Sequence, residues 1–232
     1  MISIIIPTYN ESDHIRKTIE ALFKNAEAAQ ISEIIVVDGG STDLTIPEAT
    51  AAGGRIIQSA RKGRAVQMNY AAKQANSSIL YFLHADTIPP PGFADDIRQA
   101  VQAGFASGCF TLSFDYHHWF LKANCWFTRF NSNYFRFGDQ SLFVTKEAFL
   151  RIGGFQEKHT IMEDQEIIRR LRNQVKFKII KKPVITSARK YLSNGIYKTQ
   201  GIFFLIYAMY YLGFSQNKLV KTYRNLIRQE KI

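Results

Sequence analysis

Short apolar runs of strand length alternate with longer amphipathic stretches through the first half of the chain, and this alternation constrains the fold more than any other feature. The predicted strands cover residues 2–6, 33–37, 55–58 and 79–83. Helices are predicted from Ser12 onward, where an N-cap candidate stands, and over residues 64–76 and 93–103. Strands joined by helices in this way form a parallel sheet with helices on both faces. The sequence therefore predicts an α/β fold with a mostly parallel central sheet flanked by helices.

Polar residues follow each of the four predicted strands. The carboxyl ends of parallel strands meet at one rim of the sheet, and ligands bind there. We therefore expect the following four segments to converge on one site: residues 7–11, 38–43, 61–64 and 84–86.

The segment after the second strand begins with Asp38, continues with Gly39 and Gly40, and ends in short polar residues. Glycines permit close approach or positive φ, and the polar residues suit the cap of the next helix. The chain has no Gly-x-Gly-x-x-Gly dinucleotide fingerprint. This segment alone fits an ordinary strand-to-helix turn as well as a ligand-binding turn.

The segment Arg61-Lys62-Gly63-Arg64 places three cations around a glycine directly before a predicted helix. A helix N-terminus carries a positive partial charge, so the arrangement would attract a phosphate. The alternative is a solvated basic loop.

His84 and Asp86 follow the fourth strand and supply an imidazole and a hard oxygen ligand. A Mg²⁺ or Mn²⁺ ion bound to a diphosphate needs only one or two protein carboxylates, because phosphate oxygens and water complete its shell. Three prolines at positions 89–91 then end the strand before the helix that begins near Phe93.

Three carboxylates, Glu163, Asp164 and Glu166, precede a predicted helical stretch over residues 167–172. Acidic residues stabilise a helix N-terminus, which is one explanation. The other is that mutual repulsion or burial raises one pKa and produces a general base for a hydroxyl acceptor.

The net charge of +11 comes from the last third of the chain. Residues 167–232 hold 15 Lys and Arg against one acidic residue, whereas residues 1–166 hold 15 against 18. No zinc-binding spacing or nucleic-acid motif accompanies this charge, so we expect no nucleic-acid partner. An anionic membrane surface suits residues 196–232 better. The apolar stretch 202–214 is too short to span a bilayer, which leaves a buried helix or an interfacial helix.

Aromatic residues concentrate beyond about residue 105, and we interpret most of them as core, with a minority lining an acceptor cleft. They include Trp119, Trp126, Phe130, Tyr134, Phe135 and Phe137.

The two cysteines, Cys109 and Cys125, form no disulfide framework, and the N-terminal segment MISIIIPTYNE resembles no signal peptide or spanning helix. We therefore expect no disulfide and a cytoplasmic location, with peripheral attachment to the inner face of the cell membrane.

Taken together, these motifs resemble those of a family 2 glycosyltransferase with the nucleotide-sugar-binding fold called GT-A, of the small stand-alone bacterial type. The matching segments stand in the family's order across residues 2–166: IIIPTYNE, VVDGGSTD, ARKGRAVQMNYA, LHAD in place of Asp-x-Asp, GGF, and MEDQE in place of Glu-Asp.

On the donor side, the resemblance implies the following roles: Pro7, Tyr9 and Glu11 border the nucleoside, Asp38 hydrogen-bonds the base, Arg61 and Arg64 lie near the base or diphosphate, and Asp86 binds Mn²⁺ or Mg²⁺. His84 stands where the family more usually has an aspartate, so its role as ribose contact or metal neighbour stays open.

On the acceptor side, the resemblance implies that Asp164 is the catalytic base. Asp139, Gln140 and Glu163 are further candidates to face the acceptor, because a segment similar to residues 137–140 is common in small bacterial members.

The implied reaction is a metal-dependent, inverting transfer of one sugar from a nucleoside-diphosphate sugar, with a leaning to uridine, to a hydroxyl acceptor. If the stretch 202–214 is an interfacial helix, we expect that acceptor to be lipid-linked or close to the membrane. The Gln-x-x-Arg-Trp signature and the spanning helices of the polysaccharide synthases are absent from the sequence, although residues 187–191 occupy a comparable place.

We expect a glycosyltransferase domain over residues 1–192, with a nucleotide-binding half (1–104) and an acceptor half (105–192), and a basic, aromatic helical tail over 193–232. Two alternatives remain: a nucleotidyltransferase, which should carry a glycine-rich signature near the first strand, and a non-catalytic module that binds sugar nucleotides or membranes.

Overall fold

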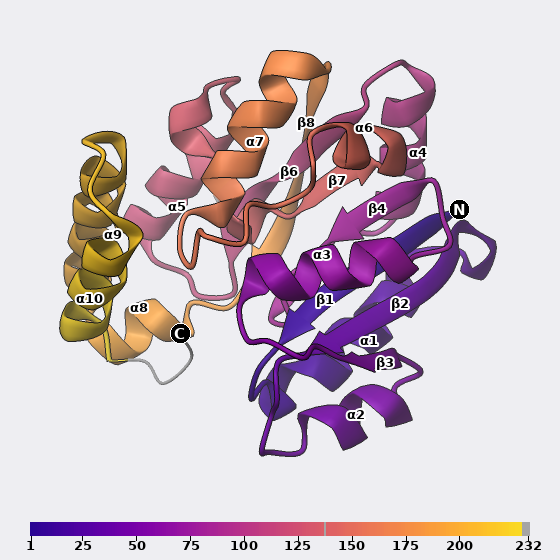
Figure 1. Ribbon diagram of the computed structural model, residues 1–232, viewed down its shortest axis with the longest axis horizontal. Helices are drawn as coiled ribbons and strands as arrows, with labels where there is room; N and C mark the ends of the chain where they lie inside the picture. The colour runs from indigo at the N-terminus through magenta and orange to yellow at the C-terminus, as the bar shows by residue number, and fades with distance from the viewer. Residues whose placement is uncertain (137, 229–232) are drawn as a thin grey trace.

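The computed structural model describes residues 1–136 and 138–228 and contains an eight-stranded sheet with the order β3-β2-β1-β4-β7-β6-β8-β5 (Figure 1). The strands are β1 (Ile2–Thr8), β2 (Ile31–Asp38), β3 (Arg55–Gln58), β4 (Ile79–Phe82), β5 (Thr87–Ile88), β6 (Ser107–Phe114), β7 (Leu142–Thr145) and β8 (Phe177–Thr186).

The half of the sheet formed by β3, β2, β1 and β4 is parallel, as the sequence predicts. Thr8 pairs with Asp38, and Asp38 pairs with Gln58, so the ends of these three strands lie side by side. The other half is mixed, because β7 runs antiparallel to β4 and β6 while β6 and β8 are parallel. The polar segments after β1, β2 and β3 therefore meet at one rim.

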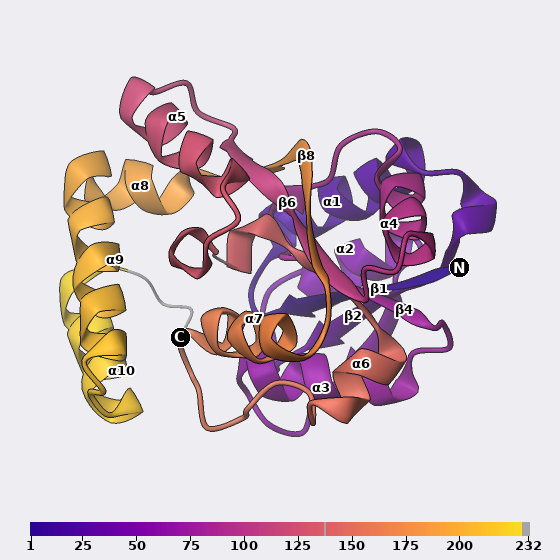
Figure 2. The same cartoon turned by 90° about the horizontal axis from the view of Figure 1, so that it is seen from above.

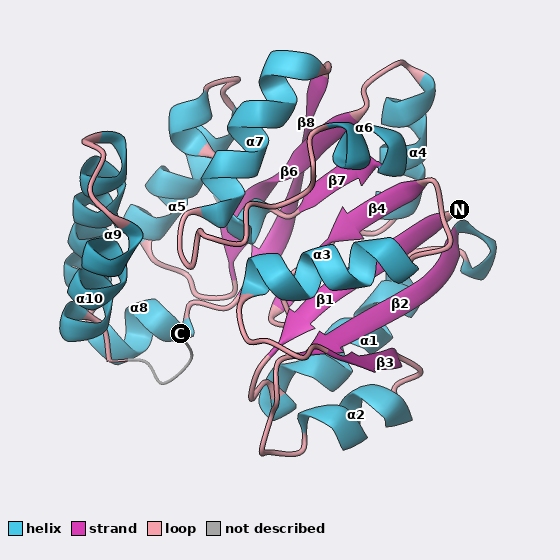
Figure 3. Cartoon of the chain, in the orientation of Figure 1, coloured by secondary structure: helices cyan, strands magenta, loops and turns pink. Residues whose placement is uncertain are grey.

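Helices cover both faces of the sheet (Figure 3). Apolar side chains of α1 and α4 pack on one face, and those of α3, α6 and α7 pack on the other. The bounds are α1 (Ser12–Asn25), α2 (Thr45–Ala51), α3 (Arg64–Gln74), α4 (Phe93–Gln102), α5 (Trp119–Trp126), α6 (Lys146–Arg151), α7 (Glu163–Gln174), α8 (Arg189–Asn194), α9 (Ile196–Tyr211) and α10 (Gln216–Leu226). Four short 3-10 helices are also present among the described residues: η1 (Ala28–Gln30), η2 (Phe127–Arg129), η3 (Asn133–Phe135) and η4 (Gly138–Gln140).

Helix α1 begins at Ser12, and its N-cap is Glu11, one residue earlier than the sequence suggests. The backbone N–H of Ser12 donates to Asp43 at 3.2 Å, and that of Glu11 donates to Thr45 at 2.7 Å. The side chains of Asp43 and Thr45 thus cap the N-terminus of α1 in place of a side chain next to it in sequence. These hydrogen bonds tie the segment after β2 to the end of β1.

The interpretation of the aromatic residues beyond position 105 as mainly core is wrong. Trp119 is 68% exposed, Tyr134 65%, Trp126 47% and Phe130 42%. These side chains lie on α5 and the segment after it, and each remains largely accessible to solvent. Phe135 is half-buried, and Phe137 lies outside the described residues. Both cysteines are free, as expected.

Helices α9 and α10 form a hairpin at one end of the molecule (Figure 1). The hairpin has an apolar cluster of its own, which also contacts Ile161 and Met162, the residues directly before α7. Helix α9 buries Ile202 and Ile206 but leaves Phe204 57% exposed, so it is neither a fully buried nor a fully exposed helix. No helix in the described part of the chain combines the length and apolarity needed to cross a membrane.

Candidate active site

Asp38 at the end of β2 is fully buried, and its carboxylate organises the loop that follows. One oxygen accepts the backbone N–H groups of Gly40 and Ser41, both at 2.8 Å, and the other accepts the hydroxyls of Ser41 and Thr8. A nucleotide base that hydrogen-bonds Asp38, the role expected from the sequence, would therefore share or displace the Ser41 hydroxyl.

The three cations of the basic loop point to different partners. Lys62 donates to the Tyr9 hydroxyl at 3.2 Å, and its ammonium lies 4.3 Å from the centre of the Tyr9 ring. Arg64, the first residue of α3, lies 3.8 Å from Glu163. Arg61 is 69% exposed and pairs with Glu157 at 2.5 Å. Lys62 and Arg64 thus face neighbouring site residues, whereas Arg61 is held at the periphery.

Arg189 joins two residues that the sequence assigns to the donor side. Its guanidinium donates to both oxygens of Glu11, at 2.8 and 2.9 Å, and pairs with Asp86 at 2.9 Å. Strand β5 pairs with β8 directly after Asp86, and the backbone N–H of Ser187 donates to the Asp86 carbonyl oxygen. This pairing brings the start of α8 to the rim. Pro7, also expected near the nucleoside, lies buried in β1.

His84 pairs with Asp139, at 3.1 Å between Nδ1 and Oδ1, and this contact joins the end of β4 to η4. Burial alone would raise the pKa of Asp139, but the hydrogen bond and charge of His84, together with Lys190 and Arg64, hold that pKa well below its usual range. Asp139 is therefore an anion at neutral pH.

Glu163 and Asp164 open α7, after Met162, which adopts a left-handed φ of 64°. Glu163 is 5% exposed; burial, followed by the charge of Asp164, raises its pKa to about 7. Burial and the charge of Asp139 also raise the pKa of Asp164. A Cβ at position 138 would stand 2.9 Å from an Asp164 oxygen, so Gly138 allows the loop to approach this carboxylate. The two acids are thus adjacent groups that bind protons more tightly than exposed carboxylates do.

The protein offers few metal-coordinating atoms near Asp86, so a divalent ion fits there only if a diphosphate supplies most of the ion's ligands. The described residues contain no cluster of three or more His, Cys, Asp or Glu side chains able to hold a metal. Asp86 is 13% exposed, and one of its oxygens contacts Arg189. One carboxylate beside phosphate oxygens and water is a common arrangement for Mg²⁺, so the residues present fit such an ion.

Gln140 does not present a polar group to an acceptor in this structure, contrary to the expectation from its position. It is fully buried; its amide nitrogen donates to the Phe135 carbonyl, and its amide oxygen accepts from Arg136 at 2.7 Å. Arg136 is also fully buried and donates to the carbonyl oxygens of Ser132, Thr128 and Phe130. Gln140 and Arg136 therefore hold the loop that carries Asp139.

The hairpin contacts the segment that leads to the two acids. Gln216, the first residue of α10, accepts from the backbone N–H groups of Thr160 at 3.2 Å and Ile161 at 3.4 Å. Its amide nitrogen lies 2.9 Å from His159 Nδ1. The hairpin thus holds the residues that immediately precede Glu163.

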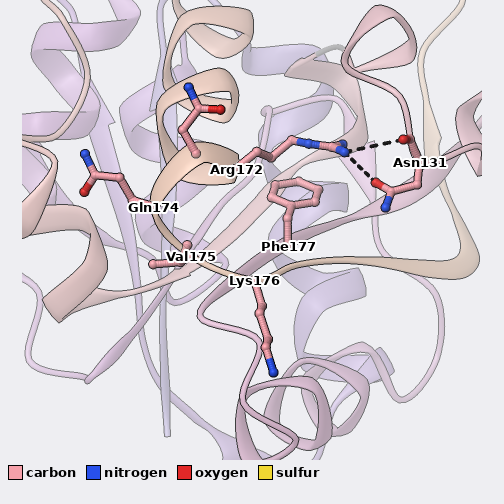
Figure 4. A pocket seen from close by; sticks show the side chains of 7 residues that line it. Asn131, Arg172, Gln174, Val175, Lys176 and Phe177 are labelled. Carbon is pink, nitrogen blue, oxygen red and sulfur yellow. Dashed lines mark hydrogen bonds between the residues drawn. The ribbon is translucent and has the colours of Figure 1, made fainter.

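A hollow of about 480 Å³ lies toward the C-terminal end of α7 and is lined by residues that include Arg172, Asn131 and Phe177 (Figure 4). Arg172 donates to the Asn131 side chain at 2.7 Å there. Arg172 and Gln174 lie eight and ten residues beyond Asp164, which is about 12–15 Å along the helix axis. The hollow is not part of the candidate active site.

Sequence reasoning did not assign roles to Arg189, Lys62 or Gln216. For Arg189, the available signal was the position of residues 187–191, comparable to the family's Gln-x-x-Arg-Trp segment. Lys62 lies in the basic loop between Arg61 and Arg64, which the resemblance places near the base or diphosphate. No motif in the sequence around Gln216 indicates a role in the site.

Comparisons with known proteins identify the family of this chain. The model of glycosyl transferase family 2 matches residues 3–155. The glycosyltransferase AglE of Haloferax volcanii is 33% identical over 94 residues, which cover 38% of this chain and 31% of that protein. The alignment thus spans about a third of that relative.

Two solved structures share the fold. Residues 1–349 of S. aureus TarS, solved with UDP-GlcNAc, superpose with a TM-score of 0.69 and 17% identity, covering 81% of this chain and 58% of that one. The mannosyltransferase PcManGT from Pyrobaculum calidifontis, solved with GDP-Man and Mn²⁺, gives a TM-score of 0.67 and 17% identity, covering 88% and 61%. With the family model matching well over half of its length, this chain belongs to glycosyl transferase family 2.

Proposed function

We propose that this protein transfers a single sugar, with inversion, from a nucleoside-diphosphate sugar to a hydroxyl acceptor, and that the donor is linked to uridine. The observation that carries this proposal is the convergence of Asp86 with Arg189, and of Asp164 with Asp139, at one rim of the sheet. Family membership supports sugar transfer over the nucleotidyltransferase and non-catalytic alternatives.

Asp86 would hold a Mn²⁺ or Mg²⁺ ion together with the donor diphosphate, in keeping with the Mn²⁺ and GDP-Man in the PcManGT structure. When bound, the ion would supply positive charge to the departing diphosphate. Arg189, Arg64 and Lys62 would add cationic groups around the same region. Tyr9, Glu11 and Asp38 would border the nucleoside.

Asp164 would accept the proton of the attacking hydroxyl. Its raised pKa makes it a stronger base than an exposed aspartate. Glu163 and Asp139 would face the acceptor beside it, and the His84–Asp139 pair would fix the position of η4. Attack on the anomeric carbon forms the new glycosidic bond as the bond to the diphosphate breaks. One displacement inverts the anomeric centre and needs no covalent nucleophile.

The acceptor would be lipid-linked or close to the membrane, with residues 196–232 binding an anionic bilayer. The protein would then be peripheral on the cytoplasmic side. The excess of Lys and Arg in this segment and its exposed apolar side chains support that attachment.

The test combines donor binding with transfer. Thermal shift across nucleoside diphosphates and their sugars, with and without Mn²⁺, should give metal-dependent stabilisation by at least one donor. Asp164→Asn should keep this stabilisation and lose transfer by about 10²- to 10⁴-fold, the usual contribution of a general base.

Glu147→Gln, at a carboxylate that is 80% exposed on α6, is the matched control and should leave transfer unchanged. Unchanged transfer by Asp164→Asn would refute the base assignment. Absence of stabilisation by every donor would refute the donor class.

A further inference from the structure

An exposed face of aromatic and apolar side chains is formed by two segments that are distant in sequence. We call it the aromatic face. The first segment is α5 with the residues that follow it, and it contributes Trp119, Trp126, Phe127, Phe130 and Tyr134. The second is α9 with its C-terminal turn, and it contributes Tyr197, Phe204, Leu205, Tyr211 and Leu212. Each of these residues is between 42% and 76% exposed.

Ring contacts join the two segments into one surface. The Tyr197 ring lies 4.9 Å from that of Phe120 and 6.5 Å from that of Trp119, measured between centroids. At the other end of α9, Tyr211 lies 6.1 Å from Tyr134. Figures 1 and 2 both place α5 at the same end of the molecule as the hairpin. The aromatic face is therefore continuous from α5 to α9.

The charges around the aromatic face have one sign. Residues 116–138 and 189–228 contain no Asp or Glu. Exposed cations accompany the aromatic residues: Lys122 and Arg129 lie in the first segment, Lys198 in the second and Lys218 in the adjoining α10. A second copy of this face would bring like charges together, which opposes self-association through it. Exposed Trp and Tyr with Lys and Arg are the composition of a surface that enters the headgroup layer of an anionic bilayer.

We propose that the aromatic face, and not the C-terminal hairpin alone, docks on an anionic lipid bilayer. This inference rests on the proposed membrane attachment of residues 196–232 and enlarges it to include α5 and residues 126–134. Both segments connect to the acids of the site. The first continues into η4 with Asp139, and the second continues into α10, whose Gln216 holds the residues before Glu163. Docking through this face would place the acceptor side of the site next to the bilayer.

The chain has only two tryptophans, Trp119 and Trp126, and both lie on the aromatic face. Intrinsic fluorescence of the full chain therefore reports on the first segment directly. With vesicles of phosphatidylcholine and phosphatidylglycerol, we expect the emission to shift to shorter wavelength and to be quenched by brominated lipid. Pure phosphatidylcholine should have a much smaller effect. Trp119→Phe and Trp126→Phe each leave one reporter and should both retain the shift.

Binding is measured in parallel by vesicle sedimentation. Trp119→Ser should weaken partitioning about tenfold, the effect of losing one large aromatic side chain from an apolar contact. Tyr70→Ser, at a side chain that is 43% exposed on α3, is the matched control and should bind like the parent protein. Circular dichroism checks that each variant is folded.

Sedimentation with unchanged tryptophan emission would mean attachment through the hairpin alone and would overturn the enlarged interface. Absence of sedimentation would overturn membrane docking altogether. A shift caused by soluble oligosaccharide but not by vesicles would identify the aromatic face as a sugar-binding surface instead. None of these outcomes affects donor stabilisation by nucleotides, which separates failure of this inference from failure of the proposed reaction.

Discussion

Arg189 lies 2.9 Å from the Asp86 carboxylate and so occupies an oxygen of the residue proposed to hold the metal. The same guanidinium neutralises Glu11, and both carboxylates are close to nine-tenths buried. A divalent ion at Asp86 would have to share this carboxylate with Arg189 or displace it. The guanidinium of Arg189 thus lies where the proposed reaction would need positive charge.

Arg189→Ala should destabilise the protein in metal-free buffer by about 1–3 kcal/mol, because two largely buried carboxylates lose their partner. Mn²⁺ should then raise the melting temperature more in this variant than in the parent protein, since the ion replaces the missing charge without competition. Arg98→Ala, which removes an exposed pair with Asp95, is the control. Equal stabilisation of parent and variant by Mn²⁺ would contradict competition at Asp86.

Glu163→Gln should stabilise the protein in a pH-dependent way. The pKa of Glu163 is raised from 4.5 to about 7, so the folded state holds this proton more tightly than the unfolded state does. The free energy of unfolding therefore falls as the pH rises through this interval. Urea unfolding should show the variant to be about 1–3 kcal/mol more stable than the parent near pH 8, and about equal to it below pH 4.5. A difference that is constant with pH would show that the burial of Glu163 is not the cause.

Gln216→Ala should lower the rate of transfer by roughly ten- to a hundred-fold while donor binding stays unchanged. Gln216 holds the backbone of Thr160 and Ile161, and a small displacement there moves the acids that follow. Asn217→Ala changes the exposed neighbour in α10 and should leave the rate unaffected. Steady-state kinetics with saturating donor make the comparison; equal rates for both variants would mean that the hairpin does not position the acids.

Arg136→Met should cost about 3–5 kcal/mol of stability, because it leaves buried carbonyl groups of Thr128, Phe130 and Ser132 without a donor. Arg129→Met, at an exposed arginine of the same loop, should change stability by less than about 0.5 kcal/mol. Urea unfolding of both variants provides the measurement. Similar midpoints would show that the loop carrying Asp139 does not depend on the buried guanidinium.

The parallel half of the fold could be predicted from the sequence because its signals are local. Strand β3 over Arg55–Gln58 has the predicted bounds, and α3 and α4 start at the predicted residues. Short continuous apolar runs indicate strands such as β1 and β4, which are buried on both faces, and apolar residues at helical spacing indicate helices that bury one face. Parallel pairing then brings the ends of the strands together, which is why Asp38 and the ends of its neighbours lie at one rim.

The partners within the site are decided by tertiary structure, since they depend on which distant segments meet. Arg189 reaches Asp86 because β5 pairs with β8, and Gln140 turns inward because Arg136 needs an acceptor in the core. Composition favoured a core position for most aromatic residues of this region, yet Trp119 is 68% and Tyr134 65% exposed. The sequence by itself determined the strands of the parallel half, the polar segments that follow them and the family motifs. Only the fold decided which charges pair and which aromatic residues face outward, because burial is set by long-range packing and not by residue type.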